Sequence, residues 1–348
     1  MARLAAMLAL VGLAACQPAA PDQGTASGVV RRALHEGEVV VYGNTDVAGP
    51  VVAGFERRFP RVKVRYRELT ATAIQDAIVS EAATGRPVAD LAWSSSMDIQ
   101  VKLVNDGYAQ AYRSPGAARL PRWAVWRDAG FGITAEPIGF AYNRRLLSPA
   151  EAPKSHADLL RAIRENPERW RGKIAMYDPA ASGVGFMYMS ADIQVYPDAW
   201  TLMGEIGRTR PGLYVPGGAI LGRVSSGQHL LAYNMNSSYA AAWASRDPEI
   251  GYVTPSDYHF TISRIAFITR SAPHPNAARL FLDYLLSEEG QEKLREGRLT
   301  PILAAPTGPQ PAGGRPIRVG PALLANLDQA RRARLLAQWR AGLSPEAR

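Results

Sequence analysis

Short apolar runs alternate with stretches of helical spacing in the first part of the chain. The run at 38–42 (EVVVY) is continuous and ends in a Gly-Asn turn, which predicts a buried strand. The pattern as a whole predicts strands at 38–42, 62–66 and 89–93 and helices at 47–59 and 72–83. Strand, helix, strand, helix and strand in this order are typical of an α/β unit with a parallel sheet.

A second α/β region follows. The predicted strands lie at 138–142, 173–176, 228–233, 250–253 and 265–268, and the predicted helices at 239–245, 276–287, 289–296 and 323–343. The last of these helices is basic and amphipathic, and the Pro/Gly-rich residues 307–316 before it predict a loop.

Small hydroxyl residues gather where predicted strands turn into helices. The turns in question contain Ser94, Ser95 and Ser96, then Ser182 and Gly183, and then Ser237, Ser238 and Tyr239. Ligands of parallel sheets bind beyond the carboxyl ends of the strands, and the free N–H groups of a helix start favour an anion. A serine is also a good helix cap whatever the function, so each turn is either a cap alone or part of a binding site. At Gly183 the missing Cβ would let a ligand approach the backbone closely.

Other side chains offer polar groups near the same strand ends. Tyr233 and Asn234 end a predicted strand and supply a phenol and an amide. Arg223 and Arg264 are candidates for a bidentate clamp on a phosphate or carboxylate, because the planar guanidinium suits that geometry.

The N-terminus has the layout of an export signal. Arg3 precedes the apolar run 4–13, and Leu13-Ala14-Ala15-Cys16 ends it with the only cysteine of the chain. The run is too short to span a bilayer, which takes roughly 20 apolar residues. We therefore predict a lipoprotein signal peptide at 1–15, a diacylglyceryl group on Cys16 and a flexible tether at 16–36. The alternative is an ordinary secretory signal with a chance cysteine.

Composition narrows the classes of function. The 348 residues, 47% hydrophobic and 20% charged, are enough for two globular domains without disulfides. The net charge of +9 favours anionic ligands or an anionic membrane surface, but the scattered arginines do not form a nucleic-acid site. The five histidines lack zinc-ligand spacing, and no G-x-S-x-G elbow, S-x-x-K motif or phosphate-binding P-loop occurs. We expect a protein without a cofactor, and not an enzyme.

Several segments together resemble the extracellular solute-binding proteins of bacterial ABC importers. They are EVVVYGNTD, FERRFPRVKVRY, ADLAWSSSMDIQVKLVNDGYA, GKIAMYDPAASGVGF, LLAYNMNSSYAA and NAARLFLDYLLSEEGQEKL, which together span residues 37–300. The resemblance is strongest to the group with ferric-iron-binding and phosphonate- or phosphorylated-compound-binding members. It implies a two-lobed α/β periplasmic-binding-protein fold of type II, with a hinge of two crossing strands near 137–142 and 252–262. Residues 37–136 plus 258–348 would form the first lobe and 137–257 the second.

The family also implies a function and further site residues. The protein would be exported to the periplasm or cell-envelope surface, tethered by lipid and monomeric, and would deliver a small solute to an ABC permease in the inner membrane. Thr45 and Asp46 match a place where the family contacts its ligand, although Asp46 could instead cap the following helix.

Iron-binding relatives typically supply a tyrosine pair and a histidine. This chain has Tyr239 alone in the matching turn and no histidine at 43–46. An anionic organic solute, namely a phosphate ester, a phosphonate or a carboxylate, is therefore favoured over ferric iron. A ligand sensor for a membrane signalling partner and a hydrolase on the same scaffold are the alternatives from other classes.

Overall fold

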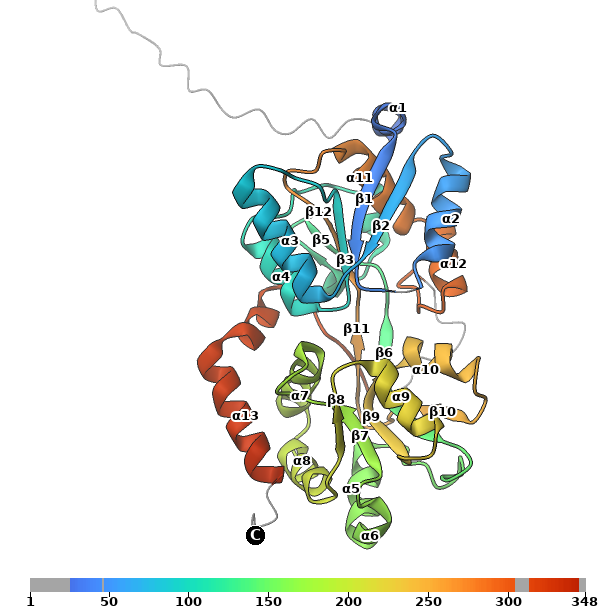
Figure 1. The fold of residues 1–348 in the computed structure, drawn as a ribbon, viewed down its shortest axis with the longest axis vertical. Coiled ribbons are helices and arrows are strands. Elements are labelled where there is room, and N and C mark those ends of the chain that lie inside the picture. Colours follow the sequence, from blue (N-terminus) through green and yellow to red (C-terminus); the bar gives the residue numbers. More distant parts are fainter. Residues whose placement is uncertain (1–25, 46, 304–312, 344–348) are drawn as a thin grey trace, which may run out of the picture.

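The computed structural model describes residues 26–45, 47–303 and 313–343. It has two lobes, each built around one β-sheet with helices on its faces (Figure 1). The predicted mixed α/β fold with two lobes is confirmed. The signal peptide, Cys16 and Asp46 lie outside the described residues.

The first lobe holds a six-stranded sheet in the order β2-β1-β3-β12-β5-β4. Strand β1 runs parallel to β2 and β3, whereas β12 is antiparallel to β3. Its elements are α1 (Ala26–Glu36), β1 (Glu38–Gly43), α2 (Gly49–Arg58), β2 (Lys63–Glu68), α3 (Ala71–Thr84), β3 (Leu91–Ser94), α4 (Met97–Asn105), two 3₁₀ helices (Pro115–Arg119 and Arg122–Ala124), β4 (Val125–Trp126), β5 (Gly130–Gly132), β12 (Ile265–Ile268), α11 (Pro275–Leu285) and α12 (Glu288–Glu296).

The second lobe holds a seven-stranded sheet in the order β13-β11-β6-β9-β7-β8, with β10 also paired to β6. Its elements are β6 (Glu136–Asn143), α5 (His156–Glu165), α6 (Pro167–Trp170), β7 (Ile174–Tyr177), α7 (Gly183–Val195), α8 (Ala199–Arg208), β8 (Gly212–Tyr214), α9 (Gly217–Ser225), β9 (Leu231–Asn236), α10 (Ser237–Ala244), β10 (Ile250–Val253), β11 (His259–Ile262), β13 (Gly314–Pro316) and α13 (Gln329–Leu343).

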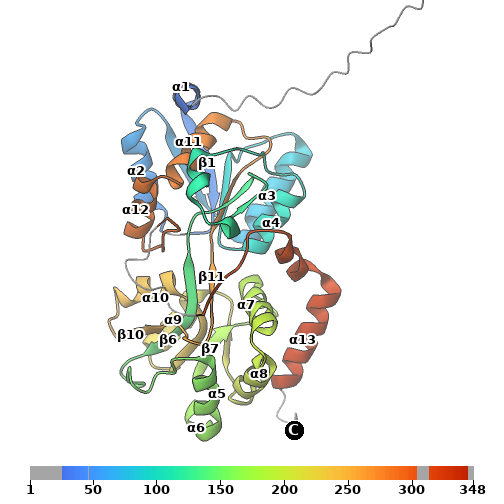
Figure 2. The same cartoon turned by 180° about the vertical axis from the view of Figure 1, so that it is seen from behind.

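Two strands connect the lobes. Strands β6 and β11 pair antiparallel at Thr261 with Pro137 and at Ile262 with Glu136, and both run between the sheets (Figure 2). These strands overlap the segments predicted for the hinge. Each lobe has its own apolar core, exemplified by Phe55 packed edge-on against Phe281 in the first.

The predicted tether is wrong for residues 26–36, where the structure has helix α1. Val29 and Ala33 are buried on its inner side, and the helix packs along α11. Arg32 donates to the Asn276 side chain at 2.9 Å, and Glu36 accepts from Ala277 N at 2.7 Å. The Pro/Gly-rich composition that suggested a tether ends before Val29, and the apolar spacing of the helix begins there.

The C-terminal segment differs from its prediction in two ways. It is a 3₁₀ helix at Pro321–Leu327 on α4, followed by α13, with Asp328 between them. Helix α13 packs on α8 and contributes Leu335, Leu336 and Trp339 to the core of the second lobe. Assigning 258–348 wholly to the first lobe was therefore wrong for α13, and also for β11 and β13, which belong to the second sheet.

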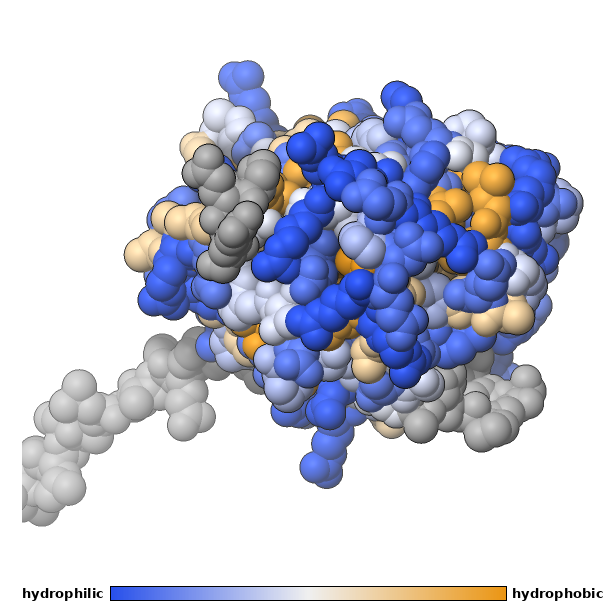
Figure 3. Space-filling view, turned by 90° about the horizontal axis from the view of Figure 1, so that it is seen from below, coloured by the Kyte–Doolittle hydropathy of each residue, from blue (hydrophilic) through white to orange (hydrophobic). Residues whose placement is uncertain are grey.

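The surface of the second lobe is mainly hydrophilic when seen from below, with apolar residues in small separate groups (Figure 3). Within residues 26–45, 47–303 and 313–343, no helix has both the length and the apolar character needed to cross a membrane.

Candidate functional site

A cavity of about 800 Å³ lies between the two lobes. Asn44, Thr70 and Arg298 line it from the first lobe, and Ser182 and Tyr239 are among the residues that line it from the second. A molecule in this cavity would therefore contact residues of both lobes at the same time.

Four helices begin at the cavity wall. Helix α3 brings Thr70 and Ala71, α7 brings Ser182, α9 brings Gly217 and Gly218, and α10 brings Asn236 and Ser238. The first N–H groups of a helix have no partner within the helix, and the helix dipole adds positive potential there. Four such starts around one cavity favour an anion.

Side chains cap three of these helix starts and leave one uncapped. Thr70 accepts from Ala73 N at 3.2 Å, Ser182 from Gly185 N at 3.1 Å, and Asn236 from Ser238 N at 2.8 Å. Helix α9 follows Pro216 and has no side-chain cap. Among the four helix starts, the first backbone N–H groups of α9 are thus the ones without a side-chain acceptor.

The three serine turns predicted from the sequence do come together at this cavity. Ser95, Ser182, Ser238 and Tyr239 line it. The Asn44 amide holds the turn at Ser95 by donating to the serine Oγ and accepting from its N–H, both at 3.0 Å. These four residues are at the wall, whether as caps or as ligand contacts.

Their neighbours have structural contacts instead. Ser94 is buried, and its Oγ accepts from Ser96 N at 3.2 Å. Thr45 is buried beneath the wall, where its carbonyl accepts from the Tyr66 hydroxyl at 2.7 Å. Around Gly183 there is open space, so no part of the protein requires glycine there.

The unpartnered hydroxyls lie at α10. The Oγ atoms of Ser237 and Ser238 are buried and have no hydrogen-bond partner among the described residues. A buried hydroxyl without a partner carries a desolvation cost of about 1–3 kcal/mol, which a ligand at Ser238 would remove.

The expectation that Tyr233 and Asn234 face the ligand is wrong. Both donate to the buried carboxylate of Asp192, from the tyrosine hydroxyl at 3.0 Å and from the asparagine Nδ2 at 2.6 Å. Strand β9 has one more residue than β6 between their pairings at Gly139 and Ala141, and Asn234 has a left-handed backbone with φ of 52°. This bulge turns two consecutive side chains toward Asp192 and brings Asn236 to the cavity.

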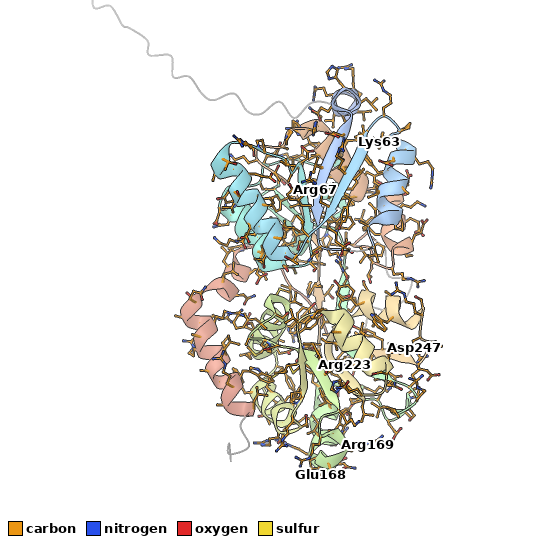
Figure 4. All side chains as sticks on the ribbon, viewed as in Figure 1. Lys63, Arg67, Glu168, Arg169, Arg223 and Asp247 are labelled. Carbon is orange, nitrogen blue, oxygen red and sulfur yellow. The ribbon has the colours of Figure 1, made fainter. Side chains whose placement is uncertain are left out.

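Neither predicted arginine lines the cavity. Arg223 projects from α9, donates to Gln228 Oε1 at 2.6 Å and stacks over Tyr214; Figure 4 shows it on the second lobe below the junction of the lobes. Arg264 is completely buried and directs two nitrogens to Glu136.

Two arginines that the sequence did not single out line the cavity instead. They are Arg246, just after α10, and Arg298, just after α12. Both side chains are exposed, and within the described ranges neither guanidinium has a hydrogen bond or ion pair to another side chain. Among the residues that the structure describes, Glu68 is the acidic residue at the wall, so the described charged side chains there sum to +1 (two arginines minus one glutamate).

Comparison with known proteins assigns the fold to a family. Residues 51–312 match the family described as bacterial extracellular solute-binding protein. The chain belongs to the bacterial extracellular solute-binding proteins. No curated protein matches it.

Solved structures agree with this family. The chain is similar to the substrate-binding protein of an ABC transporter from Agrobacterium tumefaciens, at 36% identity and a TM-score of 0.79 over 88% of this chain and 94% of that one. Iron-bound HitA from Pseudomonas aeruginosa has 19% identity and a TM-score of 0.68, over 88% and 99% of the chains. AfuA from Actinobacillus pleuropneumoniae, with fructose 6-phosphate bound, has 20% identity and a TM-score of 0.67, over 88% and 98%. The last two share the fold.

This solute-binding protein is thus the exported binding component of an ABC transporter, with a small solute and a permease as partners. The family and its structural neighbours are transport proteins and not enzymes.

Three tyrosines line the cavity of this solute-binding protein, whereas the sequence pointed to Tyr239 alone. Tyr177 and Tyr188 are the other two. Burial raises the pKa of both, so their phenols stay protonated. The described part of the chain contains no group of three or more His, Cys, Asp or Glu side chains that could hold a metal ion.

The missed wall residues carry weak sequence signals. Pro216-Gly217-Gly218 reads as an ordinary turn until α9 is known to start there, and the arginines become relevant only once the lobes meet. The one usable signal was Asn236, a residue type that commonly caps helices, directly before the serine pair.

Proposed function

We propose that this solute-binding protein captures a small anionic organic solute, namely a phosphate ester, a phosphonate or a carboxylate, and delivers it to an ABC permease in the inner membrane. The observation that supports this most is the meeting of four helix starts at one cavity, where the charged side chains of the described residues have a positive sum. Preorganised N–H groups and free guanidinium groups bind oxyanions and repel cations.

The mechanism follows from the two-lobe geometry. Asn44, Thr70 and Arg298 belong to one lobe, and Ser182, Ser238 and Arg246 to the other. An anion that contacts both sets stabilises the closed arrangement more than any open one, because only closure supplies all contacts. The permease then distinguishes loaded from empty protein by the outer surface of the closed form.

Ligand binding tests the solute class directly. Isothermal titration calorimetry with inorganic phosphate, methylphosphonate, fructose 6-phosphate, citrate and ferric nitrilotriacetate should give binding for at least one of the anions. Arg246→Ala should weaken that binding by about tenfold or more, since a hydrogen bond to a charged group contributes about 1.5–3 kcal/mol. Arg223→Ala is the matched control, because Arg223 lies outside the cavity. An equal loss of anion affinity in Arg246→Ala and Arg223→Ala would contradict the assignment of Arg246 to the binding cavity.

Ferric iron is the second candidate, favoured by the three tyrosines at the wall. In that case the wild type binds ferric nitrilotriacetate and none of the anions, and Tyr239→Phe abolishes the ferric binding. An anionic solute predicts instead that the wild type binds an anion and that Tyr239→Phe weakens this binding without abolishing it, because only one of several donors at the wall is lost.

We further propose that the protein is monomeric and held at a membrane by lipid on Cys16. Replacement of Cys16 by serine should move the protein from the membrane fraction to the soluble periplasmic fraction. Unchanged membrane association would contradict lipid attachment at this residue.

A further inference from the structure

The polar group that the site leaves unexplained is Arg264. Its side chain has no exposed surface, and neither has that of Glu136, its ion-pair partner. The Nε atom lies 2.9 Å from Glu136 Oε1 and the Nη2 atom 3.4 Å from Oε2, while Thr134 donates to Oε1 at 2.8 Å. The carboxylate is therefore fully paired.

The guanidinium of Arg264, in contrast, is only partly paired. Its Nη1 atom is buried and has no hydrogen-bond partner among the described residues. A charged donor left without a partner inside a protein costs more than a neutral one. Burial alone would lower the pKa of Arg264, but the charge of the adjacent Glu136 carboxylate raises it, so the guanidinium remains protonated. The free N–H groups of Nη1 are thus permanent donors.

This free branch is next to the cavity wall. The guanidinium carbon lies 5.6 Å from the ring centroid of Tyr239, which lines the cavity at the start of α10. The two buried, unpartnered hydroxyls of Ser237 and Ser238 belong to the same turn. Tyr239 therefore packs against a guanidinium with one unpartnered branch and directly follows two serines whose hydroxyls are also unpartnered among the described residues.

We propose that Arg264 Nη1 and the Tyr239 hydroxyl form a specificity element that selects an oxyanion of the solute and rejects a metal cation. The oxyanion completes the coordination of the guanidinium opposite Glu136. A cation bound to the Tyr239 oxygen would instead face a buried positive charge. This inference rests on the proposed function and names the residue pair that makes the cavity selective.

The pair also joins the solute to the connecting strands. Glu136 begins β6, and Arg264 follows β11, with its own N–H donating to Thr134 Oγ1 at 2.8 Å. An oxyanion held by Arg264 is consequently bonded to the segments between the lobes and not only to the lobe walls.

The test removes the pair without leaving a buried charge. In Glu136→Met with Arg264→Met, two apolar chains of similar length replace the ion pair, an exchange that buried pairs commonly tolerate. Arg264→Lys is a second variant that keeps the charge beside Glu136 but has no second branch. Arg223→Met is the matched control. Binding of inorganic phosphate, methylphosphonate, fructose 6-phosphate, citrate and ferric nitrilotriacetate is measured by calorimetry, and folding by urea unfolding.

The expected result is about 10- to 100-fold weaker binding of the bound anion in both pair variants, with wild-type affinity in Arg223→Met. Ferric binding should rise in the double variant relative to the wild type. If the wild type binds an anion and both folded pair variants bind it equally well, the inference fails while the proposed function stands. If the wild type binds none of the four anions, both fail.

Discussion

The packing of α13 on α8 makes a sharp prediction at two glycines. A Cβ built at Gly207 would lie 2.4 Å from the carbonyl oxygen of Gly342, whereas a Cβ at Gly204 would meet nothing within 4 Å. Both glycines belong to α8 and lie one turn apart. Replacing each by alanine therefore compares a clash with open space in the same helix.

The two substitutions should change the free energy of unfolding in different ways. Alanine in place of glycine stabilises a helix by up to about 1 kcal/mol, which is the change expected for Gly204→Ala. At Gly207 the opposing atom is backbone and cannot rotate away, so α13 must shift and the overpacking costs about 1–3 kcal/mol. Both alanines gain the same helix preference, so we expect Gly207→Ala to be less stable than Gly204→Ala by the overpacking cost of about 1–3 kcal/mol.

Urea unfolding, followed by circular dichroism and by tryptophan fluorescence, measures the stability of both variants. The contribution of Trp339 to the emission, measured as the difference from a matched Trp339→Phe protein, should change in Gly207→Ala because Trp339 packs with the apolar residues of α8. Equal or greater stability of Gly207→Ala relative to Gly204→Ala would refute the close approach of the two helices and the assignment of α13 to the second lobe.

Two further outcomes follow from local contacts. Ser182→Ala removes the acceptor for Gly185 N and should lower the free energy of unfolding by about 1 kcal/mol, measured in urea, while unchanged stability would argue against the cap. Burial alone would raise the pKa of Asp257, but its hydrogen bond from His156 at 2.9 Å and the charge of that ring lower it. A lowered carboxyl pKa contributes stability that is complete above the unfolded value of about 3.9 and is lost as the pH falls below it. Asp257→Asn should therefore be less stable than the wild type at pH 7 and lose less stability between pH 5 and pH 3; parallel pH curves would contradict this role.

Much of the fold could be predicted because the periodicity is strong. The run at 38–42 became β1, and the serine turns became helix starts at one edge of each sheet. Helix α1 and the 3₁₀ turn before α13 were missed because a Pro/Gly-rich prefix and a continuous apolar stripe conceal their boundaries.

The site was less accessible to sequence reasoning. The bulge at Asn234 redirects Tyr233 to Asp192, and the pairing of Arg264 with Glu136 depends on contacts between residues 128 positions apart. Arg246 and Arg298 belong to different lobes and become neighbours of one cavity only in the folded chain. Register and long-range pairing, which local patterns do not encode, decide all three.

The solute class is tested most directly on protein isolated under native conditions from cells that express it. The protein is denatured, and the released material is analysed by mass spectrometry for organic anions and by elemental analysis for iron. We predict about one equivalent of a small organic oxyanion per chain and iron far below one equivalent. One equivalent of iron without an organic anion, or a neutral or cationic solute, would contradict the account.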